Sequence, residues 1–569
     1  MLDLFNQSLA FINSIIWHQY VIFLLLIVGI IFTICTRFTQ FRSLTHGFAV
    51  VMGKYDKNDD PGSISHFQAL SAALSATVGV GNIGGTAIAI SLGGPGALFW
   101  MWIVGLLGMA LKTIEVTVAM IYRNTQQGDV TGGPMWVVER GLKNRAEWLQ
   151  PFGKLIGGLF CITLLIATFT GGLFFQAWNA SNVTQQFFGI PAPLVGFILA
   201  VVVGLVILGG IKRIGVAASR IVPFMCGVYL LAGIYVLFIH ITEIPTMFAT
   251  IFSSAFSSSN AQGAFVGGTI GAIFARGMQQ AFFSNEAGQG SSPIVHSAAK
   301  TEEPVREGIV AGLEPFIDTI VVCTLTGLVI LLSGVWNRDA DFQLEKLPQV
   351  QAIENAWQLE NSELPHGDEK GNDADWNNGD QVYCIVGIPD EDSNNIPMQQ
   401  VAGTVVETEG NLIIQWQRIT SDSKPEVHDG GVYRTYAGAS LTALAFDQAQ
   451  PGLGSWLVTL ATWLFGISTM ISWSYYGEQG VRFLFGLRGI FPYRILFCIL
   501  IFVSCLGLVQ SQTELTHLAN LGTGVMLWVN IPITLLFASD AIRHYYEYFR
   551  RVDSGEFVEQ EISEPVENE

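Results

Sequence analysis

Residues 75–85 lie inside a stretch apolar enough to cross a bilayer, yet four of these eleven residues, which read SATVGVGNIGG, are glycines. A helix in lipid has to pair its own backbone groups, so a glycine-rich break at that depth is tolerated only where the chain lines a cavity walled by protein. The peptide groups freed by such a break, together with polar side chains such as Thr77 and Asn82, are suited to binding an ionic solute. The segment therefore predicts a binding site near the middle of the membrane.

The composition is that of a polytopic membrane protein. Hydrophobic residues make up 50% of the chain and charged residues 13%, with a mean hydropathy of +0.44, far from an average soluble domain. The net charge of -18 comes mostly from one polar insert and the tail EFVEQEISEPVENE, so we expect no nucleic-acid partner. The seven cysteines show no spacing typical of a disulfide framework or a metal site.

About eleven segments reach the roughly 20 residues that a helix needs to cross the hydrocarbon core. Their approximate centres are Leu25, Val78, Leu107, Ile166, Val201, Tyr229, Ile273, Val322, Phe465, Phe502 and Met526. Lys and Arg residues gather in alternate connections, at 37–57, 123–145, 212–213, 300–306, 482–488 and 543–551. By the positive-inside rule the N-terminus lies outside and the C-terminus in the cytoplasm, which requires an odd number of spans in a cytoplasmic (inner) cell membrane.

The chain divides into a first membrane part at 1–335, a polar insert at 336–434, the last three membrane helices at 435–545 and an acidic cytoplasmic tail at 546–569. The insert contains strand-like runs, and GTVVET and NLIIQWQ are joined at Glu409-Gly410 as in a β-hairpin. We expect a small extracytoplasmic β-containing domain. The alternative is a disordered acidic loop, because NSELPHGDEKGNDADWNNGD has a composition typical of disorder.

The segment centred at Ile273 is also interrupted, and it reads GGTIGAIFARGMQQAFFSNEAGQGSSP. With the first span set aside, the remaining ten spans split into two sets of five, and each set begins with a broken helix. The charge rule gives these two helices opposite directions, as an inverted repeat requires. The alternative role for such glycines is close helix packing, which we adopt for Gly204, Gly227 and Gly233.

Six ordered blocks carry a family resemblance: FQALSAALSATVGVGNIGGTAIAI, GGPGALFWMWIVGLLGMALK, GGPMWVVERGL, FFSNEAGQGSSPIVHSAAKTEEPVREG, PFIDTIVVCTLTGLVI and STMISWSYYGEQGVRFLFG. They resemble the alanine or glycine:cation symporter family. The resemblance implies an all-α, leucine-transporter-like fold of about eleven helices, with one extra N-terminal helix before a five-plus-five inverted repeat. It also implies sodium-coupled uptake of alanine, glycine or a similar small amino acid. Val80 and Gln280 depart from the family pattern.

The first break can bind an amino-acid carboxylate, because free amides at the start of a helix favour anions. We therefore expect Gly79, Val80, Gly81 and Asn82 to contact the substrate, while carbonyls of both breaks accept from its ammonium. Three further candidates for the substrate pocket are Gln176, Phe283 and Trp473. The alternative for the two aromatic residues is an ordinary place in the core or against lipid.

Sodium prefers oxygen ligands, which the carbonyls of Ser75, Thr77 and Val78 and the amide oxygen of Asn82 can supply. The resemblance adds the hydroxyls of Ser468 and Thr469 as ligands of a second sodium position. Their alternative is bonding back to carbonyls of their own helix. An ionisable group at membrane depth suggests function by default, so Asp318 is either a cation ligand or a buried acceptor that holds two helices together.

We place Asn285, Glu286 and His296 near the cytoplasmic end, in the gate or its loop. Lys112 and Glu115, three residues apart on a helix, predict a structural ion pair.

The sequence has no GxxxxGK[ST], HExxH or GxSxG motif, so an ATP-driven pump or a common hydrolase has no support and we expect no enzyme and no cofactor. A proton-coupled or other small-solute transporter, a channel and a membrane amino-acid sensor remain open, and the oligomeric state is not predicted.

Overall fold

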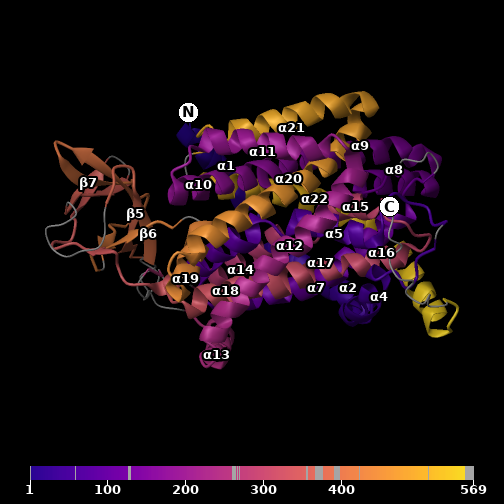
Figure 1. Cartoon of the computed structure of the whole chain (residues 1–569), viewed down its shortest axis with the longest axis horizontal. Coiled ribbons are helices and arrows are strands. Elements are labelled where there is room, and N and C mark those ends of the chain that lie inside the picture. The colour runs from indigo at the N-terminus through magenta and orange to yellow at the C-terminus, as the bar shows by residue number, and fades with distance from the viewer. Residues whose placement is uncertain are drawn as a thin grey trace.

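The computed structural model describes residues 2–57, 59–125, 130–258, 264–265, 267, 269–353, 356–365, 376–389, 398–421, 423–427, 429–436, 438–509 and 512–557. These residues form a long bundle of helices with a small β region at one end (Figure 1). The alternative of a disordered acidic loop concerned residues 361–380. Within this run Ser362–Leu364 form a strand, whereas 366–375, like the last part of the tail at 558–569, lie outside the described ranges.

The first part of the bundle contains α1 (Leu2–Ile16), α2 (Gln19–Cys35), α3 (Thr39–Arg42), η1 (Ser43–Gly47), α4 (Phe48–Val51), α5 (His66–Thr77), η2 (Gly81–Gly85), α6 (Thr86–Gly93), α7 (Gly96–Ile121), α8 (Pro134–Arg145), η3 (Glu147–Leu149), α9 (Gln150–Phe169), η4 (Thr170–Phe174), α10 (Phe175–Phe188), α11 (Ala192–Ile207) and α12 (Gly210–Ile239).

The remaining helices are α13 (Ile244–Ser254), α14 (Ile270–Asn285), α15 (Ser292–His296), α16 (Pro304–Ala311), α17 (Leu313–Pro315), η5 (Phe316–Cys323), α18 (Thr324–Leu332), η6 (Val335–Asn337), α19 (Ala439–Ala449), α20 (Leu453–Phe485), η7 (Leu487–Gly489), α21 (Ile490–Ser504) and α22 (Gln512–Asp553).

Within the described residues, eight helical segments are long and apolar enough to cross a membrane, and up to nine if the bent pair α5 and η2–α6 is one span. Segments expected around Val201 and Ile273 are helical, but α11 and α14 have 16 residues each, fewer than the roughly 20 of a typical span. The protein is therefore a mostly helical, multi-pass membrane protein, and the count of eleven stays a prediction.

The break predicted at residues 75–85 is confirmed. Ser65 starts α5 with a capping box, in which its hydroxyl accepts from the Gln68 amide and the Gln68 side chain accepts from the Ser65 amide. The helix ends at Thr77, and the chain turns by 50° before it resumes at Gly81. Every residue from Ala69 to Ala87 is buried, so the unwound backbone lies inside the protein, as the physical argument requires.

The second predicted interruption is also present. The helix α14 ends at Asn285, and Glu286 follows in the left-handed conformation with φ 55°. Helical structure returns only at Ser292, where α15 begins. The inverted relation between the two halves of the chain stays a prediction.

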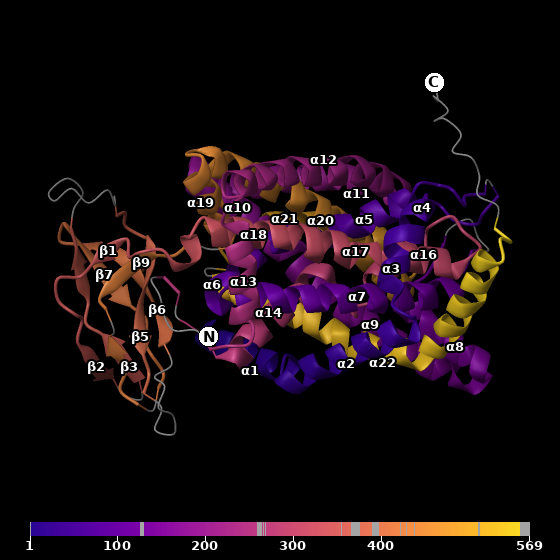
Figure 2. The ribbon, with the colours of Figure 1, turned by 90° about the horizontal axis from the view of Figure 1, so that it is seen from below.

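The insert contains a small β region with its own hydrophobic core (Figure 2). Its strands are β1 (Phe342–Gln343), β2 (Val350–Ile353), β3 (Ala356–Leu359), β4 (Ser362–Leu364), β5 (Gln381–Gly387), β6 (Met398–Thr408), β7 (Asn411–Trp416), β8 (Glu426–Val427) and β9 (Gly431–Arg434). The main sheet is antiparallel in the order β1-β9-β5-β6-β7-β4, with β8 also on β5, while β2 pairs with β3. The hairpin predicted at Glu409-Gly410 is confirmed, because β6 and β7 pair with Thr408 opposite Asn411.

The two ends of the described chain lie at opposite ends of the bundle. The start of α1 lies beside the β region, whereas the end of α22 lies at the far end (Figure 2). This arrangement fits termini on opposite sides of a membrane; which side each one faces stays a prediction.

Two of the three glycines assigned to helix packing make close contacts. A Cβ at Gly233 would lie 2.4 Å from Leu325 Cδ2, and one at Gly204 would lie 3.2 Å from Cys498 Sγ. The interpretation is wrong for Gly227, where a Cβ would meet no atom within 4 Å, because this part of α12 faces open space.

Candidate functional site

The two helix breaks border one internal cavity. Its wall is formed by Ala76, Thr77, Gly79, Gly81, Ala167, Gly171, Gln176, Phe283, Ser284, Glu286, Gln289, Trp473 and Thr523. These residues come from the first break, from α14 and the second break, and from three other helical segments, so the cavity lies in the interior of the bundle. It has both polar backbone from the breaks and aromatic side chains.

Five of the seven predicted substrate residues line this cavity: Gly79, Gly81, Gln176, Phe283 and Trp473. The Val80 amide donates to Gln176 Oε1 at 3.2 Å, and Gln176 Nε2 donates to the Gly171 carbonyl at 3.1 Å. Val80 thus helps to orient Gln176 and is not itself in the cavity wall. Asn82 also lies outside the wall.

Close approach explains the glycines of the first break. A Cβ at Gly79 would lie 2.7 Å from Thr469 Oγ1, and a Cβ at Gly81 would lie 3.1 Å from Phe283 Cε1. Gln280, one of the departures from the family pattern, donates from Nε2 to the Gly81 carbonyl at 2.9 Å. The second broken helix therefore holds the unwound backbone of the first.

Asn82 and Asp318 lie together behind the cavity. Asn82 Oδ1 accepts from the Gly79 amide at 2.8 Å, and Asn82 Nδ2 donates to Asp318 Oδ1 at 2.5 Å. The fully buried Asp318 carboxylate also accepts from Ser284 Oγ at 3.2 Å and from Thr319 Oγ1 at 2.8 Å. The cluster joins the first broken helix, α14 and η5, and all the donors that reach Asp318 in it are neutral.

A second group of candidate cation ligands lies where α5 contacts α20. Ser75 Oγ donates to the Ser468 carbonyl at 2.7 Å, and Ser468 Oγ donates to the Phe465 carbonyl at 2.9 Å. Ser468 thus makes the bond to its own helix that we gave as the alternative. Thr469 differs, because its buried Oγ1 has no hydrogen-bond partner among the residues described here. The Thr77 hydroxyl donates to the Ala73 carbonyl at 3.3 Å.

Sequence reasoning missed several residues of the cavity wall: Ala76, Ala167, Gly171, Ser284, Gln289 and Thr523. One signal was available for Gly171, since Thr-Gly-Gly at 170–172 interrupts an apolar helix and forms the π-helical turn η4. Trp473 packs so closely on this turn that a Cβ at Gly172 would lie 2.5 Å from Trp473 Cγ.

Glu286 lies in the cavity wall, although we placed it in the gate or its loop. It is 3% exposed. Its Oε1 accepts from Trp473 Nε1 at 3.0 Å and its Oε2 from Ser291 Oγ at 2.5 Å. Asn285 donates to Thr319 Oγ1 at 3.1 Å and supports the Asp318 cluster from the side of α14.

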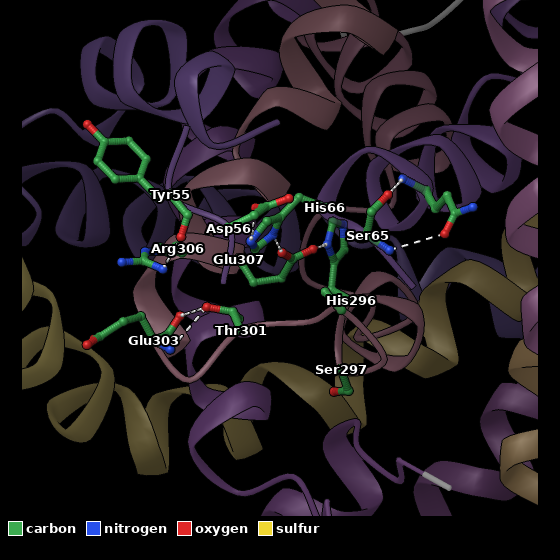
Figure 3. A network of polar contacts seen from close by, with 12 residues as sticks. Tyr55, Asp56, Ser65, His66, His296, Ser297, Thr301, Glu303, Arg306 and Glu307 are labelled. Atoms are coloured by element: carbon green, nitrogen blue, oxygen red, sulfur yellow. Dashed lines mark hydrogen bonds and ion pairs between the residues drawn. The ribbon is translucent and has the colours of Figure 1, made fainter. Parts of the chain in front are cut away.

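A chain of buried ionisable side chains continues away from the cavity. Figure 3 shows His66 and His296 on either side of Glu307. His66 Nδ1 contacts Glu307 Oε2, and His296 Nδ1 lies 2.5 Å from Glu307 Oε1. His296 Nε2 lies 2.7 Å from Glu314 Oε1. These contacts connect the start of α5 with α15, α16 and α17.

The predicted ion pair between Lys112 and Glu115 is wrong. Lys112 Nζ pairs with Glu314 Oε2 at 2.9 Å, whereas Glu115 accepts from the Gly288 amide at 3.1 Å and from Asn530 Nδ2. Both groups are buried. Helical spacing makes two side chains neighbours, but here partners from other segments bind each of them.

Arg123 follows α7 and stabilises the part of the bundle that contains the start of α5 and the end of α15. Its guanidinium donates to the carbonyls of Ser297, Ala299, Pro61 and Thr301. Burial lowers the pKa of Arg123 to about 10, which leaves it charged at neutral pH. It therefore fastens the chain before α5 to the chain after α15.

The comparisons with known proteins agree with one another. The model of the sodium:alanine symporter family matches residues 2–359 and 411–562. The sodium/alanine symporter AgcS of Methanococcus maripaludis is 34% identical, over 96% of this chain and 97% of its own. YrbD of Bacillus subtilis, a putative sodium/proton-dependent alanine carrier, is 29% identical over 96% of this chain and 93% of its own. GlnT of Bacillus subtilis, a probable sodium/glutamine symporter, is 36% identical over 59% and 68%.

Among solved structures, a manganese transporter from Eremococcus coleocola aligns with a TM-score of 0.44 at 12% identity, over 88% of this chain and 96% of that chain.

Proposed function

The chain belongs to the sodium:alanine symporter family, and we propose that it imports alanine, glycine or a similar small amino acid together with sodium by alternating access. It is a sodium-coupled amino-acid transporter, as its family and relatives are, and not an enzyme.

The observation that carries the proposal is the cavity between the two broken helices. Its wall combines the backbone of Gly79 and Gly81 with the side chains of Gln176, Phe283 and Trp473. Backbone amides at a helix start bind a carboxylate, and the two aromatic rings offer an apolar surface to a small side chain. A small zwitterion fits both requirements.

We assign one sodium position to the carbonyls of Ser75 and Val78 with the hydroxyls of Ser468 and Thr469. Support comes from the contact of α5 with α20 and from Thr469 Oγ1, a buried oxygen that no described group satisfies. A buried polar atom without a partner costs about 1–3 kcal/mol. A cation at this position would remove that cost.

We assign a second cation position to Asn82 and Asp318. The Thr77 carbonyl, five residues before Asn82, is a further candidate ligand. A carboxylate inside the membrane costs several kcal/mol unless a cation or donors stabilise it, and Asp318 receives only neutral donors from the described side chains that bond to it. The Asn82 amide can turn its oxygen toward such a cation, because amide orientation is assigned from the hydrogen-bond network.

Coupling to sodium gives the transport its driving force. Moving one positive charge inward yields about 2.3 kcal/mol for each 100 mV of membrane potential, whereas a zwitterion has no net charge and gains nothing from the potential. Bound sodium must therefore raise the affinity for substrate in the outward-open state, which is a coupling free energy between two sites.

We propose that two contacts beyond the cavity wall act as the gates. Toward the β region, α19 covers the first broken helix: Thr442 Oγ1 donates to the Ile83 carbonyl at 3.0 Å, and a Cβ at Gly84 would lie 2.8 Å from the Ala439 amide. Toward the other end, the His66–Glu307 contact holds α5 against α16. When the cavity opens to one side of the membrane, the contact at that gate would separate while the contact at the other gate stays intact.

We propose that the β region faces outward from a cytoplasmic membrane and that the end of α22 lies in the cytoplasm. The positive-inside pattern supports this orientation, and so does the location of the start of α1 beside the β region (Figure 2).

Uptake of radiolabelled alanine into proteoliposomes tests the function. An inward sodium gradient should drive accumulation above the outside concentration, while a proton gradient alone should not. Accumulation with the proton gradient alone would favour a proton-coupled transporter, of the kind named for YrbD. Equilibration without accumulation would indicate a channel, and binding without any flux would indicate a sensor. Competition by glycine, serine, glutamine and D-alanine then defines the substrate.

A further inference from the structure

We propose that the Glu286 carboxylate binds the substrate's ammonium group. This inference deepens the proposed function and rests on it, because it names the group that recognises the positive end of an amino-acid zwitterion. The carbonyls of the helix breaks can accept hydrogen bonds, but they carry no net charge.

Glu286 lines the same cavity as Gly79 and Gly81 and lies in the unwound segment between α14 and α15. Its backbone has φ 55°. Residues other than glycine rarely adopt this conformation, and it often marks a functional site. The first break therefore presents the Gly81 backbone, and the second break a carboxylate, to the same cavity.

Glu286 is 3% exposed, and the groups that donate to it, Trp473 Nε1 and Ser291 Oγ, are both neutral. The nearby cation Lys112 is already paired with Glu314. Buried charges are normally paired, and each carboxylate oxygen retains a free lone pair after accepting one bond. An ammonium in the cavity supplies the missing countercharge.

Glu286 differs in position from the buried acids Asp318 and Glu115. Asp318 lies behind Asn82 and does not line the cavity, and neither does Glu115, which binds Asn530 and the Gly288 amide. Glu286 is the one carboxylate in the described cavity wall. Asp318 is therefore placed for the cation and Glu286 for the amino acid.

The test compares alanine with propionate, which keeps the carboxylate and the methyl group but lacks the ammonium. Equilibrium binding of both is measured on the purified full chain at saturating sodium, for the wild type and for Glu286→Gln. Glutamine keeps the shape and an acceptor for Trp473 but loses the charge. The matched control is Glu115→Gln, which removes a buried charge away from the cavity.

We expect Glu286→Gln to weaken alanine binding by roughly tenfold or more, the size of one charge-assisted hydrogen bond. The ratio of alanine to propionate affinity should fall by a similar factor, whereas Glu115→Gln should leave the ratio within about twofold of the wild type. A purely structural role would weaken both ligands equally, and an unchanged ratio would overturn the inference.

Two further outcomes are also decisive. If Glu286→Gln changes only the sodium concentration needed for binding, Glu286 serves the ion and the inference is wrong. If the wild type binds no amino acid at all, the proposed function fails and the inference fails with it.

Should Glu286→Gln not fold, modification of wild-type Glu286 by dicyclohexylcarbodiimide provides the second measurement. Mass spectrometry should show that alanine slows modification of Glu286 much more than propionate does. Equal protection by both compounds would overturn the inference.

Discussion

At the scale of single residues, the important feature is the set of polar atoms whose partners come from far along the chain. Asn82 contacts Asp318, Ser75 contacts Ser468, and Glu286 accepts from Trp473. Each of these contacts connects a broken helix to another part of the bundle. Small chemical changes at these positions should therefore alter ion or substrate affinity more than they alter folding.

Replacing Thr469 with alanine should weaken sodium binding. The substitution removes a buried hydroxyl that has no described partner, so the folded protein loses no hydrogen bond but the proposed ion loses one ligand. We expect the sodium concentration for half-maximal alanine uptake to rise roughly fivefold or more, using about 1 kcal/mol for one oxygen contact.

The matched control is Thr462→Ala, on the same helix, whose hydroxyl donates to the Thr459 carbonyl at 2.8 Å. Its sodium activation should match that of the wild type. Identical sodium curves for Thr469→Ala and Thr462→Ala would contradict the assignment.

Replacing Asp318 with asparagine tests the other cation position. Asparagine keeps the size and one acceptor oxygen, which can still accept from Asn82 and Ser284 at the Oδ1 position, while the Thr319 hydroxyl at the Oδ2 position has to turn away. The change removes the negative charge. We expect sodium-driven uptake to fall at least tenfold while the protein still elutes as a folded species, since the buried charge rather than its hydrogen bonds attracts the ion. Full uptake at unchanged sodium affinity would show that Asp318 is only a structural acceptor.

At the scale of elements, the proposed gates are the contacts that cover the two interrupted helices. The first break lies under α19, and the start of α5 is fastened by His66 and Arg123. Backbone packing closes one end, whereas charged side chains close the other. The two ends should therefore respond to different kinds of substitution.

Gly84→Ala should stop transport by preventing closure under α19. The added Cβ would lie 2.8 Å from the Ala439 amide and 3.1 Å from the Gly438 carbonyl carbon, and crowding of this kind in a packed interior costs about 1–3 kcal/mol. We expect alanine binding to persist and sodium-driven uptake to fall at least tenfold. Gly227→Ala, where nothing lies within 4 Å, should transport normally; similar uptake by both variants would refute this view of α19.

Arg123→Gln should destabilise the opposite end. The change removes most of the donors that reach four carbonyls, one before α5 and three after α15, and carbonyls left without donors cost about 1–3 kcal/mol each. The midpoint of thermal unfolding should fall by roughly 2 °C or more relative to the wild type. Arg145→Gln, which removes one bond to the Leu536 carbonyl, should change it less, and the reverse order would contradict the role given to Arg123.

At the scale of the whole molecule, the sequence allowed prediction of features that depend on local chemistry. Glu409-Gly410 marks a tight turn by residue type, and the glycines of 75–85 mark a break by their density. Contacts between segments that are distant in the sequence could not be predicted from local sequence patterns. Lys112 and Glu115 are neighbours by helical spacing, but Glu314 and Asn530 approach from elsewhere. The place of Glu286 in the cavity depends on a positive φ that one sequence does not reveal.

The β region is an appendage that transport should not need. It has its own core, the family model does not cover residues 360–410, and its two ends meet where Arg338 Nη2 donates to the Arg434 carbonyl at 2.6 Å. Replacing residues 340–433 with a short Gly-Ser linker should leave the concentration of alanine for half-maximal uptake within about twofold, because loop closure depends weakly on length. Loss of substrate affinity in a folded variant would give the region a direct role.

The most direct test of the central claim is the cryo-EM density of the protein with sodium and alanine. Density for the amino acid should lie where the two broken helices meet, with its carboxylate at the Gly81 backbone and its ammonium at Glu286. Density for alanine at another location, with this cavity filled by side chains alone, would contradict that claim.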